Sequence, residues 1–416
     1  MPFSPHLAGS YHDSLSLHID TNSTVPRGVW RSHATQLADH LRAAGELDGL
    51  TDERWYQAIR ETPRHLFVPG YYTRDAYHHP SRWCLQEPSD PASTAAWLAT
   101  VYSTTTLVTA LSTDTEPGNP TPVSASTAPD HALRMLHALC ITDQMRVLEV
   151  GTGTGYLTAL LAHRLGADHV TSIDIDPDLT DHARGHLAAL GLTPTLNSGD
   201  GARGALEHAP FDRILAACTL DSIPSSWITQ TRPGALVLAH VRNLAGTGTP
   251  LLLRHRSGDI LDGRFMAWPV IHLPVRRPVH EIRRRCYSAV GIGRTRTTPV
   301  DPTELNRGTP LSLLAQLHLP TGTTHHVRLD ANTAPASYFA APDGSWAEVS
   351  HTADHRGLRD AREAGPTALI SAIEDAWNEW GHLRCPQWTD FGITATPGRT
   401  IAWHGHPTSG RTWPLT

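Results

Sequence analysis

The chain has 416 residues, 39% of them hydrophobic and 18% charged, and a chain of this length is expected to form two or three domains. Its formal net charge is -6, which argues against nucleic acid as the main partner. All 34 Lys plus Arg positions are arginine, so Schiff-base chemistry and a P-loop lysine are excluded.

The cysteines and the apolar runs indicate the compartment. The five cysteines lie far apart and none forms a C-x-x-C pair, so neither a disulfide framework nor a zinc ribbon is predicted. No basic segment followed by an apolar run opens the chain, and no apolar stretch reaches the roughly 18 residues of a membrane span. We expect a cytoplasmic protein without a membrane partner. Pairs such as His325-His326 are expected by chance among 27 histidines, and no metal site is predicted.

The N-terminal third combines helices with a polar insertion. Residues 1–25 are polar and aperiodic and are expected to form a flexible arm. Apolar residues at helical spacing predict two helices within residues 30–69. Residues 80–125 form an insertion rich in Ser, Thr and Pro on the substrate side, interrupted by the strand-like run TVYSTTTLVTAL and followed by a loop, TDTEPGNPTP, which is expected to be exposed.

From residue 146 onward, strand patterns alternate with helix patterns, which predicts an α/β fold with a doubly wound parallel sheet. The predicted strands are MRVLEV, HVTSIDID, TPTLNSG, FDRILAA and GALVLAHV, and helices are predicted at YLTALLAHRLG, PDLTDHARGHLAALG and DSIPSSWITQ. Two further strands flank Ser257-Gly258-Asp259 and are expected to close the sheet as an antiparallel hairpin. We assign residues 26–280 to one domain that contains this sheet.

Five arginines within residues 275–286 mark the next boundary. Residues 281–416 are expected to form a small C-terminal α+β accessory domain. Its predicted helix covers residues 368–383, and its predicted strands are HHVRLD, DFGITAT and RTIAWHG. The tryptophans of this region are expected to form a compact core.

The segment VLEVGTGTG joins the first predicted strand to the first predicted helix of the α/β fold. Glycines there permit a sharp turn and a close ligand, and the following helix offers free N–H groups. The glycines Gly151, Gly153 and Gly155 form G-x-G-x-G rather than the dinucleotide pattern G-x-G-x-x-G, and Glu149 precedes them. Together with Thr152, these residues favour S-adenosyl-L-methionine over NAD.

Two acids follow at the ends of the next strands. Asp174, followed by Ile175, ends the second strand 19 residues after Gly155, where a carboxylate can accept both ribose hydroxyls. Asp174 could equally be a cap for the next helix. Asp200, followed by Gly201, ends the third strand, where a carboxylate can take the adenine amino group. The three features in this order predict a cofactor site.

The specific motifs come next. Residues 63–69 (PRHLFVP) and 126–129 (STAP), followed by LEVGTGTGY, SGDG, FDRI and IPSSWITQTRPG, resemble the protein-L-isoaspartate O-methyltransferase family over about residues 30–278. The resemblance implies a class I SAM-dependent methyltransferase fold, with a Rossmann-like sheet, and S-adenosyl-L-homocysteine as the product. The long spacer and the C-terminal DFGIT, IAWHG and TWPL are similar to the branch associated with graspetide clusters, in which ATP-grasp enzymes macrocyclise a peptide.

The resemblance also implies site residues. The family's T-I-S-x-P element falls on residues 125–129, so the position of the family's catalytic serine is held by Thr127, which keeps the hydroxyl and adds a methyl group. Ser126 could supply the hydroxyl instead. We further expect Ser124, Pro129, Arg276 and Arg277 to bind substrate, although an arginine run is more often a solvated face.

Three functions therefore remain open. The first hypothesis is methylation of an aspartate carboxylate in a ribosomally made precursor peptide or its macrocyclised form, giving an ester that can collapse to an aspartimide. The second is general isoaspartyl repair, and the third is a noncatalytic peptide-binding protein that keeps a vestigial SAM fold. About 130 residues beyond the core are taken to favour the first. The sequence indicates no oligomeric state.

Overall fold

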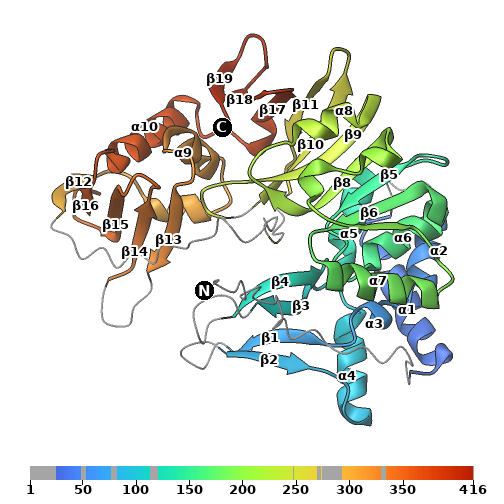
Figure 1. Ribbon diagram of the computed structural model, residues 1–416. Coiled ribbons are helices and arrows are strands. Elements are labelled where there is room, and N and C mark those ends of the chain that lie inside the picture. Colours follow the sequence, from blue (N-terminus) through green and yellow to red (C-terminus); the bar gives the residue numbers. More distant parts are fainter. Residues whose placement is uncertain are drawn as a thin grey trace, which may run out of the picture. The chain divides into compact units, whose positions relative to one another are not determined.

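The computed structural model describes residues 25–47, 53–75, 82–112, 120–246, 248–268, 273, 293–328 and 334–415 (Figure 1). The chain divides into two compact units. The first consists of Met1–Thr142 and Thr152–Gly199, and the second of Asp143–Gly151 and Asp200–Thr416. The glycine segment predicted from the sequence therefore contributes residues to both units.

The first unit contains most of the helices predicted for the N-terminal half. Its helices are α1 (Arg27–Ala43), α2 (Glu53–Glu61), α3 (Arg64–Phe67), α4 (Pro91–Val101), α5 (Pro129–Ala138), α6 (Tyr156–Leu165) and α7 (Pro177–Ala189). The strands β6 (Val170–Asp174) and β7 (Thr195–Ser198) pair in parallel, as the alternating pattern predicts. The two helices predicted within residues 30–69 are confirmed, with the short α3 following them.

An antiparallel sheet with the strand order β2-β1-β3-β4 takes three strands from the predicted insertion of residues 80–125 and β1 from the residues before it. The strands are β1 (Tyr71–Asp75), β2 (Arg82–Gln86), β3 (Leu107–Ser112) and β4 (Thr121–Ser126). Residues 113–119 of the predicted loop lie outside the described residues.

Helix α4 corrects the prediction of one strand across residues 100–111, because the helix continues to Val101 and the strand begins at Leu107. The Asp90 carboxylate accepts hydrogen bonds from the N–H groups of Ala92 and Ser93, and Pro91 occupies the first helical turn. These local signals start a helix, but the many Ser and Thr residues that follow are poor helix formers and concealed it.

The second unit contains a long mixed sheet with the strand order β19-β18-β17-β11-β10-β9-β8-β5. Its strands are β5 (Val147–Val150), β8 (Phe211–Leu220), β9 (Thr231–Arg242), β10 (Gly248–Arg256), β11 (Ile260–Phe265), β17 (Phe391–Thr396), β18 (Arg399–His404) and β19 (Arg411–Pro414). Strands β5, β8 and β9 run parallel, and helix α8 (Ser225–Thr229) connects the last two.

The predicted hairpin is confirmed, since β10 and β11 pair antiparallel around residues 257–259. The sheet does not end there. Strand β17 pairs with β11, and β18 and β19 follow it outward. Residues 391–414 thus extend the sheet of the α/β fold, although the sequence assigns them to a separate accessory domain.

The remaining C-terminal residues form an α+β arrangement with a five-stranded antiparallel sheet of order β12-β16-β15-β14-β13. The strands are β12 (Arg294–Thr298), β13 (Thr324–Arg328), β14 (Ala336–Ala340), β15 (Trp346–Ala353) and β16 (Arg359–Ala364). Helix α10 (Leu369–His382), predicted from the sequence, packs against α9 (Leu311–His318), which the sequence did not reveal because its apolar run is short. Trp388, Trp403 and Trp413 are buried, as expected, whereas Trp377 and Trp380, which were predicted to join the same core, are half-buried.

Among the described residues, no helix is long and apolar enough to span a bilayer, and no group of three potential ligands is arranged to hold a metal ion.

Candidate active site

The glycine segment begins where β5, buried along its whole length, ends. Gly151, Gly153 and Gly155 have φ values of 98°, 51° and 85°, a region that side chains with a Cβ disfavour. A Cβ on Gly155 would lie 2.9 Å from the Cβ of Ala183 on α7, so this position has no room for a larger residue. The segment therefore needs glycine at these positions, and α6 begins directly after it.

Asp174 lies under the glycine segment at the end of β6. Its Oδ2 accepts a 2.8 Å hydrogen bond from the N–H of Gly153, and its Oδ1 accepts a 3.1 Å bond from the N–H of Asp176. The cap of helix α7 is Asp176, which accepts from the N–H groups of Asp178 and Leu179. The alternative role of Asp174 as the helix cap is thus wrong, and its carboxylate is instead bound to the glycine turn.

The other predicted cofactor residues occupy different surroundings. In the first unit, Thr152 is buried and its hydroxyl lies 2.6 Å from that of Ser172, while Ile175 is half-buried. In the second unit, Glu149 is fully buried. Asp200 accepts from the N–H of Ala202 at 2.9 Å and so opens a single helical turn, η2 (Gly201–Arg203).

Strand β4 brings the candidate catalytic hydroxyls to the glycine segment. A Cβ built on Gly153 would lie 3.7 Å from Ser124 Oγ and 3.8 Å from the carbonyl oxygen of Ala125, which is ordinary contact. Strand β4 ends at Ser126, and Thr127 follows it. Ser124 and Ala125, which lead into the S/T-x-P element, therefore lie beside Gly153 within the first unit.

The two neighbouring hydroxyls differ in their surroundings. Ser126 is 2% exposed, and its Oγ lies 3.4 Å from the donor Nη2 of Arg64. Thr127 is half-buried, and within the described chain its carbonyl oxygen accepts from Arg64 whereas its hydroxyl makes no hydrogen bond. Only the Thr127 hydroxyl combines partial exposure with freedom to bind another group.

The predicted substrate residues are placed in part. Ser124 is 3% exposed and accepts a hydrogen bond from Thr109 Oγ1 at 3.0 Å. Pro129 is buried in the first turn of α5. Arg276 and Arg277 lie outside the described residues. Contact between these residues and a substrate stays a prediction.

Phe67 of the PRHLFVP motif packs against two helices next to the glycine turn. The ring of Phe67 packs on Tyr156 and on His186, with centroid distances of 5.9 and 5.4 Å. Burial lowers the pKa of His186 to about 4, so this imidazole is neutral at physiological pH. The short helix α3 therefore contacts the first residue of α6 and one residue of α7.

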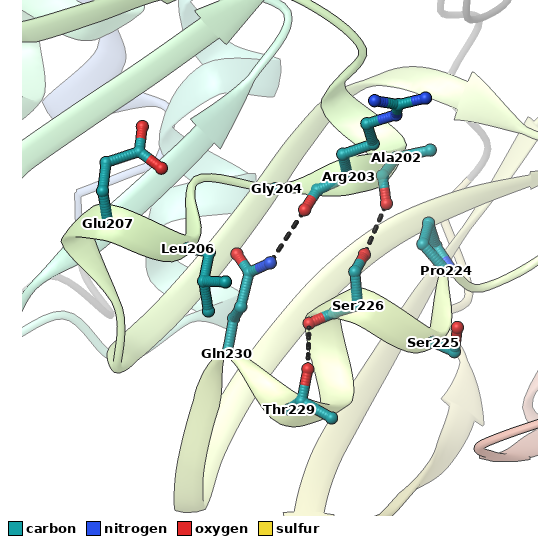
Figure 2. Close-up of a pocket in the computed structure, with 10 residues that line it drawn as sticks. All are labelled: Ala202, Arg203, Gly204, Leu206, Glu207, Pro224, Ser225, Ser226, Thr229 and Gln230. Carbon is teal, nitrogen blue, oxygen red and sulfur yellow. Dashed lines mark hydrogen bonds between the residues drawn. The ribbon is translucent and has the colours of Figure 1, made fainter.

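A cavity of about 600 Å³ in the second unit was not predicted from the sequence. Figure 2 shows its lining, contributed by the turn after Asp200 and by helix α8. Gln230 donates to the carbonyl oxygen of Arg203 at 2.7 Å, and Ser226 donates to that of Ala202. Both of these side chains are hydrogen-bonded to backbone atoms of the wall itself. The SGDG and IPSSW motifs lie next to its lining and are the sequence features that could have indicated it.

Comparison with known proteins places the chain in a family. The profile described as "Protein-L-isoaspartate(D-aspartate) O-methyltransferase (PCMT)" matches residues 32–261. A protein-L-isoaspartate O-methyltransferase of Maricaulis maris is 31% identical over 241 residues, which cover 56% of this chain and 91% of the relative. One of Methylorubrum extorquens is 40% identical over 145 residues, covering 35% of this chain and 62% of the relative.

A solved structure supports the fold. A chain described as a protein-L-isoaspartate O-methyltransferase matches with a TM-score of 0.50 at 19% identity, covering 87% of this chain and 96% of its own. That match extends well beyond residues 26–280. The likeness in fold therefore includes part of the C-terminal region.

Proposed function

Because the chain belongs to the protein-L-isoaspartate O-methyltransferase family, whose members are SAM-dependent carboxyl O-methyltransferases, we propose that it methylates the carboxylate of an isoaspartyl residue in proteins, which is the α-carboxylate and branches from the main chain like a side chain. The observation that carries the proposal is the arrangement of three parts within the first unit: the glycine turn from Thr152 onward, the Asp174 carboxylate bonded to Gly153, and Ser124 and Ala125, which lie beside Gly153 and lead into the S/T-x-P element.

The residues present fit a nucleoside-bearing cofactor. The glycine turn presents no side chain at Gly151, Gly153 and Gly155, and the Asp174 carboxylate already accepts a hydrogen bond from the N–H of Gly153. We assign Glu149, Gly151, Thr152, Gly153, Gly155, Asp174, Ile175, Asp200 and Gly201 to binding S-adenosyl-L-methionine. When bound, this cofactor supplies a methyl group from its sulfonium centre.

The protein's own part in the reaction is positioning. A side-chain carboxylate has a reference pKa near ~4 and is already ionised at neutral pH, so it needs no general base. We assign the Thr127 hydroxyl the role of donating a hydrogen bond to the substrate carboxylate. Holding reactants in near-attack geometry can lower a barrier by about 7 to 11 kcal/mol, which is the contribution required here.

The ester determines the later fate of the substrate. An aspartyl methyl ester is a neutral electrophile, and the next backbone nitrogen can attack it, releasing methanol and closing a succinimide ring. In repair, hydrolysis of that ring partly restores ordinary aspartate.

Methylation of a macrocyclised ribosomal peptide is the second candidate. It is supported by the resemblance of the spacer and of the C-terminal motifs to the graspetide-associated branch. The relatives favour repair, because those most similar to this chain are named for isoaspartate methylation alone.

Parallel assays separate these candidates. We expect transfer of labelled methyl from S-adenosyl-L-methionine to an isoaspartyl peptide and weak transfer to a ring-closed acidic precursor peptide encoded next to the gene. Methylation of the ring-closed peptide alone would overturn the repair assignment in favour of peptide maturation. Calorimetry that detects no binding at millimolar S-adenosyl-L-methionine would support the third candidate, a noncatalytic peptide-binding protein.

A further inference from the structure

Arg64 is a fully buried arginine to which the proposed reaction so far gives no role. Its Nη1 donates to the carbonyl oxygens of Val101 and Ser103 at 2.7 and 2.9 Å. Its Nη2 donates to the carbonyl oxygen of Thr105 at 3.1 Å, to that of Thr127 at 3.2 Å, and to Ser126 Oγ at 3.4 Å. One guanidinium thus joins the segment after α4 to the end of β4.

Burying this guanidinium costs free energy, because a charged group loses its hydration. Each of the five hydrogen bonds goes to a neutral oxygen, and the ring of Tyr156 lies 5.4 Å from the guanidinium carbon. Burial lowers the pKa of Arg64 to about 10, which still leaves it charged at neutral pH. A buried charge requires hydrogen-bond partners, and the two terminal nitrogens of Arg64 find five acceptors around the planar fork, whereas its Nε has no partner in the described chain.

The bonds to β4 restrict the two candidate hydroxyls differently. Because Nη2 holds both the Ser126 side chain and the Thr127 carbonyl, the peptide between them cannot rotate freely. The Ser126 oxygen is then occupied as an acceptor in a buried position, whereas the Thr127 hydroxyl stays available.

We propose that Arg64 is a positioning residue, which fixes the backbone at residues 126 and 127 so that the Thr127 hydroxyl, and not that of Ser126, meets the substrate carboxylate. The proposal rests on the proposed methyl transfer. Three residues further along α3, Phe67 lies under Gly155, with its Cδ1 3.6 Å from the position a Cβ would take. The same helical turn thus supports both the substrate element and the glycine turn.

The test compares Arg64→Ala, Arg64→Lys and Ser126→Ala with wild type in isoaspartyl-peptide methylation. We expect Arg64→Ala to lower kcat at least tenfold, while calorimetry gives a Kd for S-adenosyl-L-methionine within twofold of wild type. Arg64→Lys should recover little, because an ammonium cannot reach both groups of acceptors. Ser126→Ala, which loses one acceptor and keeps the backbone, should lower kcat only a few-fold.

The matched control is Tyr102→Phe. Tyr102 lies between two residues whose carbonyl oxygens accept from Arg64, and the change removes the 2.8 Å hydrogen bond between its hydroxyl and His65. It should lower Tm but leave kcat near wild type. Added guanidinium at millimolar concentration should restore turnover of Arg64→Ala, while tetramethylammonium at the same ionic strength should not.

The outcomes are separable. Wild-type kcat in Arg64→Ala, or an equal loss in Tyr102→Phe, would make Arg64 merely structural and leave methyl transfer intact. Loss of activity in Ser126→Ala as large as in Arg64→Ala would identify Ser126 as the reacting hydroxyl and overturn the inference. If Arg64→Ala fails to fold, the Arg64→Lys and Ser126→Ala results decide. A wild type that methylates neither an isoaspartyl nor an aspartyl peptide overturns the proposed function, and this inference with it.

Discussion

At the scale of single side chains, Asp174 obtains its role from the backbone around it. Two N–H groups, from Gly153 and Asp176, hold its two oxygens. A carboxylate oxygen has capacity for more than one hydrogen bond, so both can still accept from a ligand. The side chain therefore enters binding with its orientation already set, which lowers the entropic cost of ordering it.

Asp174→Asn tests this role. An amide has one acceptor oxygen, so it cannot keep both N–H bonds and still accept from ribose hydroxyls. A hydrogen bond to a charged group contributes about 1.5 to 3 kcal/mol, so we expect a Kd for S-adenosyl-L-methionine roughly 10- to 100-fold higher. Calorimetry measures it. Asp176→Asn, which alters the cap of α7, is the control and should leave this Kd near wild type; equal losses in both would contradict the assignment.

Thr127→Ala tests the hydroxyl. We expect kcat to fall by about one to two orders of magnitude, since a hydrogen bond to a charged group is lost, while the Kd for S-adenosyl-L-methionine is kept. Thr127→Ser retains the hydroxyl and should stay within a few-fold of wild type. Steady-state kinetics with an isoaspartyl peptide provide the measurement, and an unchanged kcat in Thr127→Ala would remove this residue from the mechanism.

At the scale of elements, the packing of α7 against the glycine turn limits what the turn can contain. Ala183 of α7 is fully buried, and its Cβ approaches Gly155 to the distance at which a second Cβ would overlap it. The close packing thus needs both a small residue on the helix and a glycine in the turn, although the two positions lie 28 apart in the sequence.

Gly155→Ala should destabilise the protein by two effects, backbone strain at a φ of 85° and the clash with Ala183. We expect a loss of about 2 to 5 kcal/mol, from about 1 to 2 for the strain and about 1 to 3 for overpacking. Gly191→Ala has a similar φ of 72° with open space around it, so it isolates the strain. Urea unfolding measures both, and a second change, Ala183→Gly, should recover part of the loss. Equal losses at residues 155 and 191 would contradict the clash.

At the scale of the whole molecule, the second unit depends on strands from the far end of the chain. Phe391, Ile393 and Ala395 of β17 are fully buried, and Arg264 of β11 lies over the ring of Trp403 at 4.7 Å. The outer strands thus cover an edge and an apolar surface that β11 would otherwise expose.

Removal of residues 391–416 should therefore yield an aggregated protein, because an uncovered strand edge with an apolar face pairs with other chains. Size-exclusion chromatography and circular dichroism measure the result. A monomeric truncated protein with the Tm of the full chain would show that these strands are dispensable.

Buried histidines should make the first unit sensitive to acid. Burial lowers the pKa of His65 and of His186 to about 4, below the unfolded value near 6.5. The unfolded chain therefore takes up protons first as the pH falls, so the stabilisation is fully present above pH 6.5 and is lost between about 6.5 and 4. We expect Tm to fall over that range and to fall less in His186→Leu. An equal dependence in both proteins would contradict the role of His186.

Much of the fold was predictable because its signals are local. The glycine turn, the alternation of strands and helices, and the hairpin at residues 257–259 depend on residue types at fixed short spacings. Helix α4 and strands β14 to β16 were missed, since their composition is Ser-, Thr- and Ala-rich and their partners lie elsewhere in the chain.

The sequence by itself determined the family, the cofactor and the order of the site's parts, because these depend on motifs read along the chain. Only the tertiary structure decided three points. It decided that Asp176 caps α7, that the Ser126 hydroxyl is bound to Arg64, and that the strands of residues 391–414 extend the sheet from β11. Each of those outcomes depends on contacts between residues far apart in sequence, such as Arg64 with Ser126 and β11 with β17, and no local spacing encodes them.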